Sequence, residues 1–227
     1  MATTPLLKIC GLTTIPDLRQ AQRCGADFLG LIVEVEGSPR SLPLAQACGL
    51  ARLCPERLVA VTTSTDPAQL RRIVETLRPR ALQLHDPSAL EAAQPLRGLT
   101  QLWLAVPVPA QAEDREGAIA DALALLAEAQ QAGVEMIVLD TCAPGDRRTQ
   151  ATGGTGQTSD WDVAAEIVRQ SPLPVLLAGG ISPDNATEAL ARVQPAGLDA
   201  SSRLECAPGR KDARAVRALA AQVKPPT

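Results

Sequence analysis

The chain has 227 residues, of which 45% are apolar and 21% charged, and its formal net charge at pH 7 is −3. These values are typical of a soluble globular protein and argue against intrinsic disorder. The negative charge argues against a nucleic-acid-binding surface, and no apolar run reaches the roughly 18 residues needed to span a bilayer. The first residues lack the basic and apolar regions of a secretion signal, so we expect a cytoplasmic protein that binds neither nucleic acid nor membrane.

Cysteine and histidine are distributed in a way that argues against a metal site. The six cysteines include no C-x-x-C pair, and without a secretion signal they are expected to be reduced thiols and not a disulfide framework. His85 is the only histidine. A histidine-rich metal site or a Ser-His-Asp triad is therefore hard to build, and we expect no bound metal.

Short apolar runs of strand length recur along the whole chain. Their hydrophobicity is nearly continuous and does not alternate, which is typical of parallel strands that are covered on both faces. There are eight such runs, at residues 6–12, 27–33, 58–63, 81–85, 100–106, 136–140, 174–180 and 197–202.

Amphipathic segments between these runs predict helices, most clearly at residues 15–25, 67–79, 121–133 and 182–193. Alternation of strand and helix over a little more than 200 residues predicts an α/β protein, a single (β/α)8 (TIM) barrel domain spanning residues 1–227. The alternative is a doubly wound open sheet, which would need a glycine-rich fingerprint after the first strand, and KICGLTT is not one. The long polar connection at residues 141–160 is predicted to be either a functional lid or a mobile segment.

In a barrel of this kind the active site lies at the C-terminal ends of the strands, so the residues that follow each apolar run are the candidates. The first strand ends at Cys10, the second leads into Arg40, and the sixth ends at Asp140. The fourth ends near Gln83 and His85, which we expect to line a substrate site.

Glycines and serines after the last two strands predict a phosphate site. Gly179 and Gly180 are followed by SPDN at the expected start of a helix, and Ser201 and Ser202 offer hydroxyls and amides. Backbone N–H groups can approach an oxyanion closely at glycines, and a helix N-terminus adds partial positive charge. The alternative is that these glycines only permit tight turns.

Cys10 and Asp140 are the candidates for acid–base chemistry. A carboxylate that closes an apolar run is costly to bury without a purpose, whereas a free cysteine is more often a small buried apolar group. A thiolate that accepts a proton and a carboxylic acid that donates one would form a general base and a general acid across the barrel mouth. For this to work, cationic neighbours must lower the pKa of the cysteine and burial must raise the pKa of the aspartate.

Several motifs together carry a resemblance to a known family. They are KICGLT, GAD-x-LG followed by SPR, QLH, LD before GGTG-x-x-x-DW, LAGGISPDN and LDASSRLE-x-x-PGRKD. Their order resembles that of phosphoribosylanthranilate isomerase, an enzyme of the tryptophan pathway, and the likeness runs from Lys8 to about Asp212.

The resemblance implies a (β/α)8 barrel without a cofactor that acts on a phosphosugar. It implies that Cys10 is the general base at C2′, that Asp140 is the general acid at the ring oxygen, and that Arg40 pairs with the anthranilate carboxylate. It also implies a set of phosphate-binding residues, namely Gly154, Gly179, Gly180 and Ser202.

Some positions depart from the family pattern near the expected site. Arg203 stands where the family usually has glycine after the serine pair, so it either crowds the phosphate or supplies a bidentate contact to it. Asp86 replaces the glycine of QLHG, and two aromatic residues before SPR are absent. These changes fit an active isomerase, or else a barrel that takes another phosphosugar or serves only as a binding protein. A histidine-pathway isomerase is less favoured, because such enzymes use an aspartate pair. A homodimer remains open.

Overall fold

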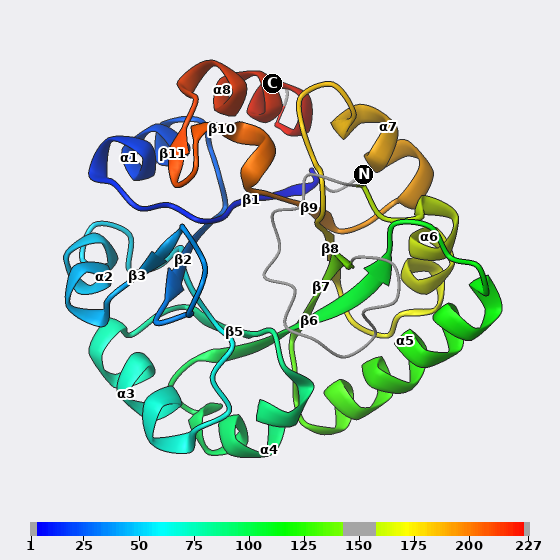
Figure 1. Ribbon diagram of the computed structural model, residues 1–227, viewed down its shortest axis with the longest axis horizontal. Helices are drawn as coiled ribbons and strands as arrows, with labels where there is room; N and C mark the ends of the chain where they lie inside the picture. Colours follow the sequence, from blue (N-terminus) through cyan, green and yellow to red (C-terminus); the bar gives the residue numbers. More distant parts are fainter. Residues whose placement is uncertain (1–3, 143–157, 225–227) are drawn as a thin grey trace.

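A computed structural model describes residues 4–142 and 158–224 of the chain. In these residues, eight parallel strands form a closed ring with helices around it (Figure 1). The ring closes because the first strand, β1, hydrogen-bonds both to β2 and to β9. The strands of the ring are β1 (Leu6–Ile9), β2 (Phe28–Val33), β4 (Leu58–Thr62), β5 (Ala81–Leu84), β6 (Gln101–Pro109), β7 (Met136–Cys142), β8 (Val175–Leu177) and β9 (Gly197–Ala200).

Three short strands lie outside the ring. β3 (Ser41–Leu42) extends β2 in parallel, and β10 (Glu205–Ala207) pairs with β11 (Arg210–Lys211) as an antiparallel hairpin that follows β9. β3 pairs with the last two residues of β2, and the hairpin comes after the C-terminal end of β9, so both contribute to the surroundings of the expected site.

Helices cover the outside of the ring and follow the strands in sequence. In the described residues they are α1 (Ile15–Arg23), α2 (Leu44–Ala51), α3 (Pro67–Leu77), α4 (Leu90–Ala93), α5 (Arg115–Gln131), α6 (Trp161–Gln170), α7 (Ala186–Val193) and α8 (Ala213–Val223), with short 3-10 turns at η1 (Pro87–Ala89), η2 (Gln94–Leu96) and η3 (Ser202–Leu204). None of the helices in this part of the chain has the length and hydropathy needed to cross a bilayer.

Most helices begin at a residue whose side chain accepts hydrogen bonds from the first-turn N–H groups. Such a cap contributes roughly 1 kcal/mol, because those N–H groups have no partner within the helix. The capping residues are Thr14, Asp66, Asp114, Asp160 and Asp212.

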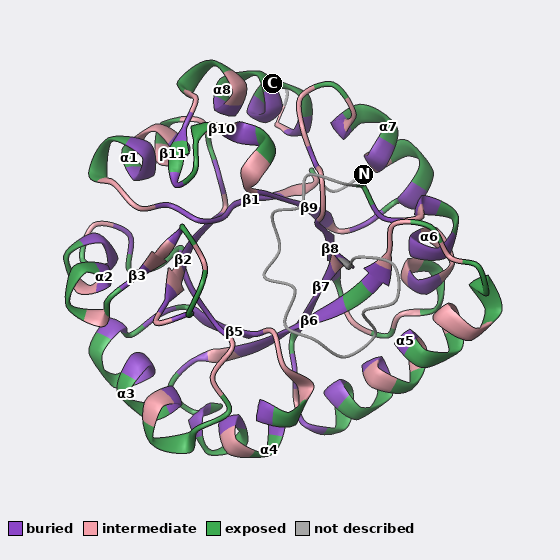
Figure 2. Cartoon of the chain, in the orientation of Figure 1, coloured by how far each residue is buried: buried purple, intermediate pink, exposed green. Residues whose placement is uncertain are grey.

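The apolar core has two layers. The larger one lies between the strands and the helices, and the smaller one fills the inside of the barrel. In Figure 2 the strands of the ring are mostly purple, which marks buried residues. Phe28 and Trp103 pack edge to face inside the barrel with centroids 4.7 Å apart, and Arg80 lies over the Phe28 ring. These side chains fill the N-terminal half of the barrel, so the open space lies at the other end.

The predicted barrel is confirmed, and each of the eight apolar runs overlaps one strand of the ring, although β6 and β7 continue beyond the end of their runs. The open-sheet alternative is wrong because β1 pairs with β9. Two helix starts differ from the prediction: α5 begins at Arg115, directly after its cap Asp114, and α7 begins only at Ala186. Residues 182–185 instead form a turn in which the Asn185 side chain bonds the Ser182 N–H and the Gly180 carbonyl.

Candidate active site

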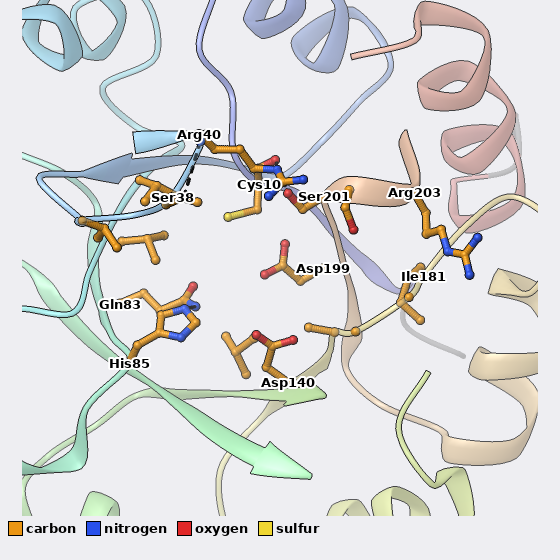
Figure 3. A pocket seen from close by; sticks show the side chains of 18 of the residues that line it. Cys10, Ser38, Arg40, Gln83, His85, Asp140, Ile181, Asp199, Ser201 and Arg203 are labelled. Atoms are coloured by element: carbon orange, nitrogen blue, oxygen red, sulfur yellow. Dashed lines mark hydrogen bonds between the residues drawn. The ribbon is translucent and has the colours of Figure 1, made fainter. Parts of the chain in front are cut away.

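One cavity opens at the C-terminal ends of the strands, with about 740 Å³ of empty space including its mouth. The residues predicted from the sequence converge on it from six different strands or the loops after them (Figure 3). Gly154 lies outside the described residues. The predicted residues that line the cavity are Cys10, Arg40, Gln83, His85, Asp140, Gly179, Gly180, Ser202 and Arg203.

Cys10 directly follows β1 and is buried at the wall of the cavity. Its N–H bonds the Ala200 carbonyl at the end of β9, which fixes the backbone, and its thiol lies against Gly30 of β2. A Cβ at Gly30 would lie 2.7 Å from the Cys10 sulfur and 3.0 Å from its Cα. Glycine at this position therefore makes the space that the thiol occupies.

Opposing influences set the proton affinity of Cys10. Burial raises the pKa of the thiol most strongly, and the Lys8 ammonium opposes this by its charge and by a hydrogen bond. The Asp199 carboxylate raises the pKa, and the Lys211 ammonium lowers it to a smaller extent. The net result is a pKa above the ordinary value of 9.0, so the free protein holds Cys10 as a thiol at neutral pH.

Asp140 lies on β7 on the other side of the cavity in Figure 3, with Asp199 between it and Cys10. Burial, followed by the negative charge of Asp199, raises the pKa of the Asp140 carboxyl to about 6. The Thr141 N–H, which donates to Asp140 Oδ1 over 2.9 Å, and the Lys8 ammonium limit this rise. A carboxyl group with this pKa can hold a proton to donate near neutral pH.

An ion pair between neighbouring strands lies next to the two candidate acid–base residues. Lys8 of β1 and Asp199 of β9 stand opposite each other in the strand register, and Lys8 Nζ lies 2.5 Å from Asp199 Oδ2. The Lys8 side chain is fully buried and that of Asp199 is 7% exposed. The pair places one positive and one negative charge next to the two candidate acid–base groups.

Gln83 and His85 form a neutral polar edge of the cavity. Their side chains meet at 3.2 Å between Gln83 Nε2 and His85 Nε2. Burial and then the Lys8 charge lower the pKa of His85 to about 4, so the ring is neutral at pH 7. This contact joins the Gln83 amide to the neutral ring and fixes the two side chains relative to each other.

Arg40 is held in place by a carboxylate that the sequence did not reveal. Its Nε and Nη2 donate to the two oxygens of Glu205, each over 2.8 Å, and Lys211 Nζ donates to the same carboxylate. The Arg40 stem crosses Gly11, where a Cβ would lie 2.7 Å from Arg40 Cδ. The guanidinium, bonded through Nε and Nη2, thus has a fixed orientation at the cavity wall.

The glycines after β8 take a conformation that only glycine adopts easily. Gly179 and Gly180 have φ angles of +80° and +63°, and a Cβ on Gly179 would collide with the Thr141 side chain. Ser202 begins the 3-10 turn η3, and the exposed Arg203 follows it. The expected helix N-terminus is not directly at these glycines, because α7 begins at Ala186.

Sequence reasoning did not assign four charged residues that shape the site, namely Lys8, Asp199, Glu205 and Lys211. A signal existed for the first two, since a charge inside a buried strand is costly and needs a partner. The partners belong to the first and last strands of the ring and lie 191 residues apart in the chain. Only closure of the barrel brings them together.

Comparison with known proteins supports the resemblance found in the sequence. The model of the N-(5′-phosphoribosyl)anthranilate (PRA) isomerase family matches residues 7–222. The chain belongs to this family. PRA isomerases from Haloferax volcanii and Halorubrum lacusprofundi are 35% and 37% identical to it, covering 96% and 92% of this chain and 92% of each relative.

Solved structures of PRA isomerases share the fold. The enzyme from Thermotoga maritima superposes with a TM-score of 0.79 at 26% identity, and that from Thermococcus kodakaraensis with 0.78 at 30% identity. These matches cover 97% and 98% of this chain and 98% and 100% of the respective structures. As a PRA isomerase, the chain is an intramolecular oxidoreductase of tryptophan biosynthesis, and of the hypotheses that the sequence left open the matches support this one.

Proposed function

We propose that Cys10 and Asp140 carry the two proton transfers by which N-(5-phosphoribosyl)anthranilate becomes 1-(carboxyphenylamino)-1-deoxyribulose phosphate. The observation that carries the proposal is their convergence on one cavity, from β1 and β7, in a member of the PRA isomerase family. Two other titratable groups in the cavity fit these roles less well. His85 is a weak base, because its pKa is lowered to about 4, and Asp199 is paired with Lys8.

The reaction opens a sugar ring and moves one hydrogen. Asp140 donates its proton to the furanose oxygen while the bond from C1′ to that oxygen breaks and the anthranilate nitrogen supplies electrons to C1′. The Cys10 thiolate then removes the proton from C2′, and the resulting enolamine tautomerises to the amino-ketose. No atom is lost, and no electron acceptor is needed because oxidation at C2′ balances reduction at C1′.

The proton states of the free protein shape the expected pH dependence. The working form has Cys10 ionised and Asp140 protonated, whereas the pKa values favour the reverse at neutral pH. In both forms Cys10 and Asp140 together hold one proton, so changing the pH does not change the ratio of the two forms. The working form is therefore a constant fraction of all molecules in which the pair holds one proton. The rate should therefore rise with pH through the pKa of Asp140, near 6, and fall through that of Cys10, above 9.0.

The remaining cavity residues are proposed to bind the two ends of the substrate. Arg40 would bind the anthranilate carboxylate, for which its fixed guanidinium is suited, and Gln83 and His85 would contact the substrate between its ends. The phosphate would be bound by Gly179, Gly180, Ser202 and Arg203 together with Gly154.

Turnover of phosphoribosylanthranilate, followed by the loss of anthranilate fluorescence, tests the proposal. Cys10→Ser and Asp140→Asn should each lower kcat by about 10²–10⁴. Cys24→Ser, at the end of α1, and Asp66→Asn, which keeps a capping side chain on α3, are matched controls and should retain activity. An inactive wild type, or a Cys10 or Asp140 variant as active as the parent, would refute the assignment.

Three further statements belong to the same proposal. The chain forms a single domain over residues 1–227, works in the cytoplasm, and is able to form a homodimer. Sedimentation at two protein concentrations tests the last of these.

A further inference from the structure

Stability alone does not explain why the ion pair of Lys8 and Asp199 is buried. Isolated buried charges cost several kcal/mol each, and replacing such a pair by neutral groups of similar size is often harmless to stability. Here one charge comes from β1 and the other from β9, both inside otherwise apolar strand runs. A pair at this position needs an explanation beyond holding the barrel together.

One oxygen of the pair is left without a partner. Asp199 Oδ2 binds Lys8, but Oδ1 is buried and has no hydrogen-bond partner among residues 4–142 and 158–224. Asp199 lines the cavity and lies between Cys10 and Asp140 in Figure 3. A purely structural ion pair would be expected to satisfy both oxygens, because each unsatisfied buried acceptor costs about 1–3 kcal/mol.

The two charges act unequally on the two working groups. Cys10 is faced by Lys8 from β1, by Asp199 from β9 and by Lys211 from β11, and among these charges Lys8 has the largest influence. Asp140 is faced by Asp199 and Lys8, and there Asp199 has the larger influence. The positive end of the pair therefore dominates at the base and the negative end dominates at the acid.

We propose that Lys8 and Asp199 are positioning residues that raise the fraction of the working form, the ammonium by stabilising the Cys10 thiolate and the carboxylate by keeping the proton on Asp140. This inference rests on the proposed roles of Cys10 and Asp140. Burial pushes both groups toward their uncharged forms, which is useful for the acid and harmful for the base. A single positive charge would lower the pKa of both Cys10 and Asp140 and would therefore ionise the acid as well. The ion pair favours the Cys10 thiolate and still keeps the proton on Asp140.

The inference predicts how the rate profile changes when the pair is neutralised. The double variant Lys8→Met/Asp199→Asn removes both charges, conserves side-chain size and leaves no buried charge unpaired. Without the pair, the pKa of Cys10 should rise and that of Asp140 should fall. The bell-shaped dependence of the rate on pH should widen on both its acidic and its basic side by about one pH unit or more, which is the size of the pKa shift expected for a charged neighbour. The plateau should fall tenfold for each unit of widening, because the working form becomes rarer.

The single variants separate the two halves of the inference. Asp199→Asn should move the ascending limb, set by Asp140, to lower pH. Lys8→Met should move thiolate formation at Cys10 to higher pH, measured as the pH dependence of iodoacetamide alkylation of the peptide that contains Cys10, quantified by mass spectrometry. Lys224→Met and Asp27→Asn, which remove an ion pair of the same composition near the opposite end of the barrel, are the matched controls and should leave both curves in place.

The outcomes distinguish this inference from the proposed function. The inference is overturned if the maximal rate falls while the two limbs of the pH–rate profile and the pH dependence of Cys10 alkylation stay unchanged. That result would show that the ion pair is only structural. Because alkylation reports on Cys10 without substrate, that curve decides the role of Lys8 even if the wild type fails to turn over phosphoribosylanthranilate. In that event the proposed function fails by itself.

Discussion

Neutralising Glu205 should destabilise the protein strongly, because this one carboxylate holds two buried cations. It accepts two hydrogen bonds from Arg40 and one from Lys211, each over 2.8 Å. The Arg40 and Glu205 side chains are only 10% and 5% exposed. Removing one partner of a buried pair costs about 3–5 kcal/mol, and since glutamine keeps one acceptor oxygen we expect about 3 kcal/mol for Glu205→Gln. That is a large share of the roughly 5–15 kcal/mol by which a domain is stable.

Urea unfolding at pH 7 measures this loss. Glu188→Gln is the matched control: this glutamate also pairs with an arginine, Arg192, but its side chain is 61% exposed, so its loss should cost about 0–1 kcal/mol. The reasoning fails if Glu205→Gln unfolds within about 1 kcal/mol of the wild type.

The same variant has a pH signature. Burial alone would raise the pKa of Glu205, but the hydrogen bonds from Arg40 and Lys211 outweigh it and hold the pKa below 4.5. A depressed pKa contributes stability above the unfolded value that is lost as pH falls through the folded value. The difference in unfolding free energy between wild type and Glu205→Gln should therefore be full above pH 4.5 and shrink below it.

Two further substitutions and one titration test separate parts of the site. Gly30→Ala should cost about 1–3 kcal/mol in urea unfolding and lower kcat, because its Cβ would displace the Cys10 thiol; an alanine variant with full activity would contradict the close contact. Because His85 is the only histidine, its imidazole C–H signals in NMR spectra are identified directly, and their titration should be centred near pH 4 and not near 6.5, since desolvation and the Lys8 charge lower its pKa. Arg203→Gln should raise KM about tenfold with little change in kcat if its guanidinium binds the phosphate, whereas Arg210→Gln, an exposed control on β11, should not; equal KM values would exclude that contact.

The strands were predictable because parallel strands buried on both faces leave uninterrupted apolar runs in the sequence. Helices with a clear start and a polar face, such as α1 and α3, were predictable for the same kind of reason. The start of α7 was not, since SPDN satisfies the pattern of a helix start but forms a turn closed by the Asn185 side chain. Local pattern identifies an element more reliably than it locates its first residue.

The candidate site was predictable as a set of strand ends but not as a set of contacts. Cys10 and Asp140 each follow an apolar run, so their place at the mouth follows from the fold alone. The partner of Arg40 did not follow, because Glu205 belongs to a hairpin after the last strand, and the sequence gives no distance between that hairpin and the loop after β2. Carboxylate binding was expected of Arg40, and a carboxylate of the chain itself already occupies one edge of it.

Closure of the sheet and assembly of the site take place at the same seam between β1 and β9. The Cys10 N–H bonds the Ala200 carbonyl, the Ser201 hydroxyl bonds the Cys10 carbonyl, and Lys8 meets Asp199, all across this seam. These contacts join residues about 190 positions apart, so the loop-closure entropy of almost the whole chain opposes them and they are expected to form late in folding. A barrel that opens at this seam would keep most of its helices and strands but would lose the orientation of Cys10, the proposed general base. Activity should therefore report on closure of the barrel, and should be lost before the helical signal when the seam is weakened.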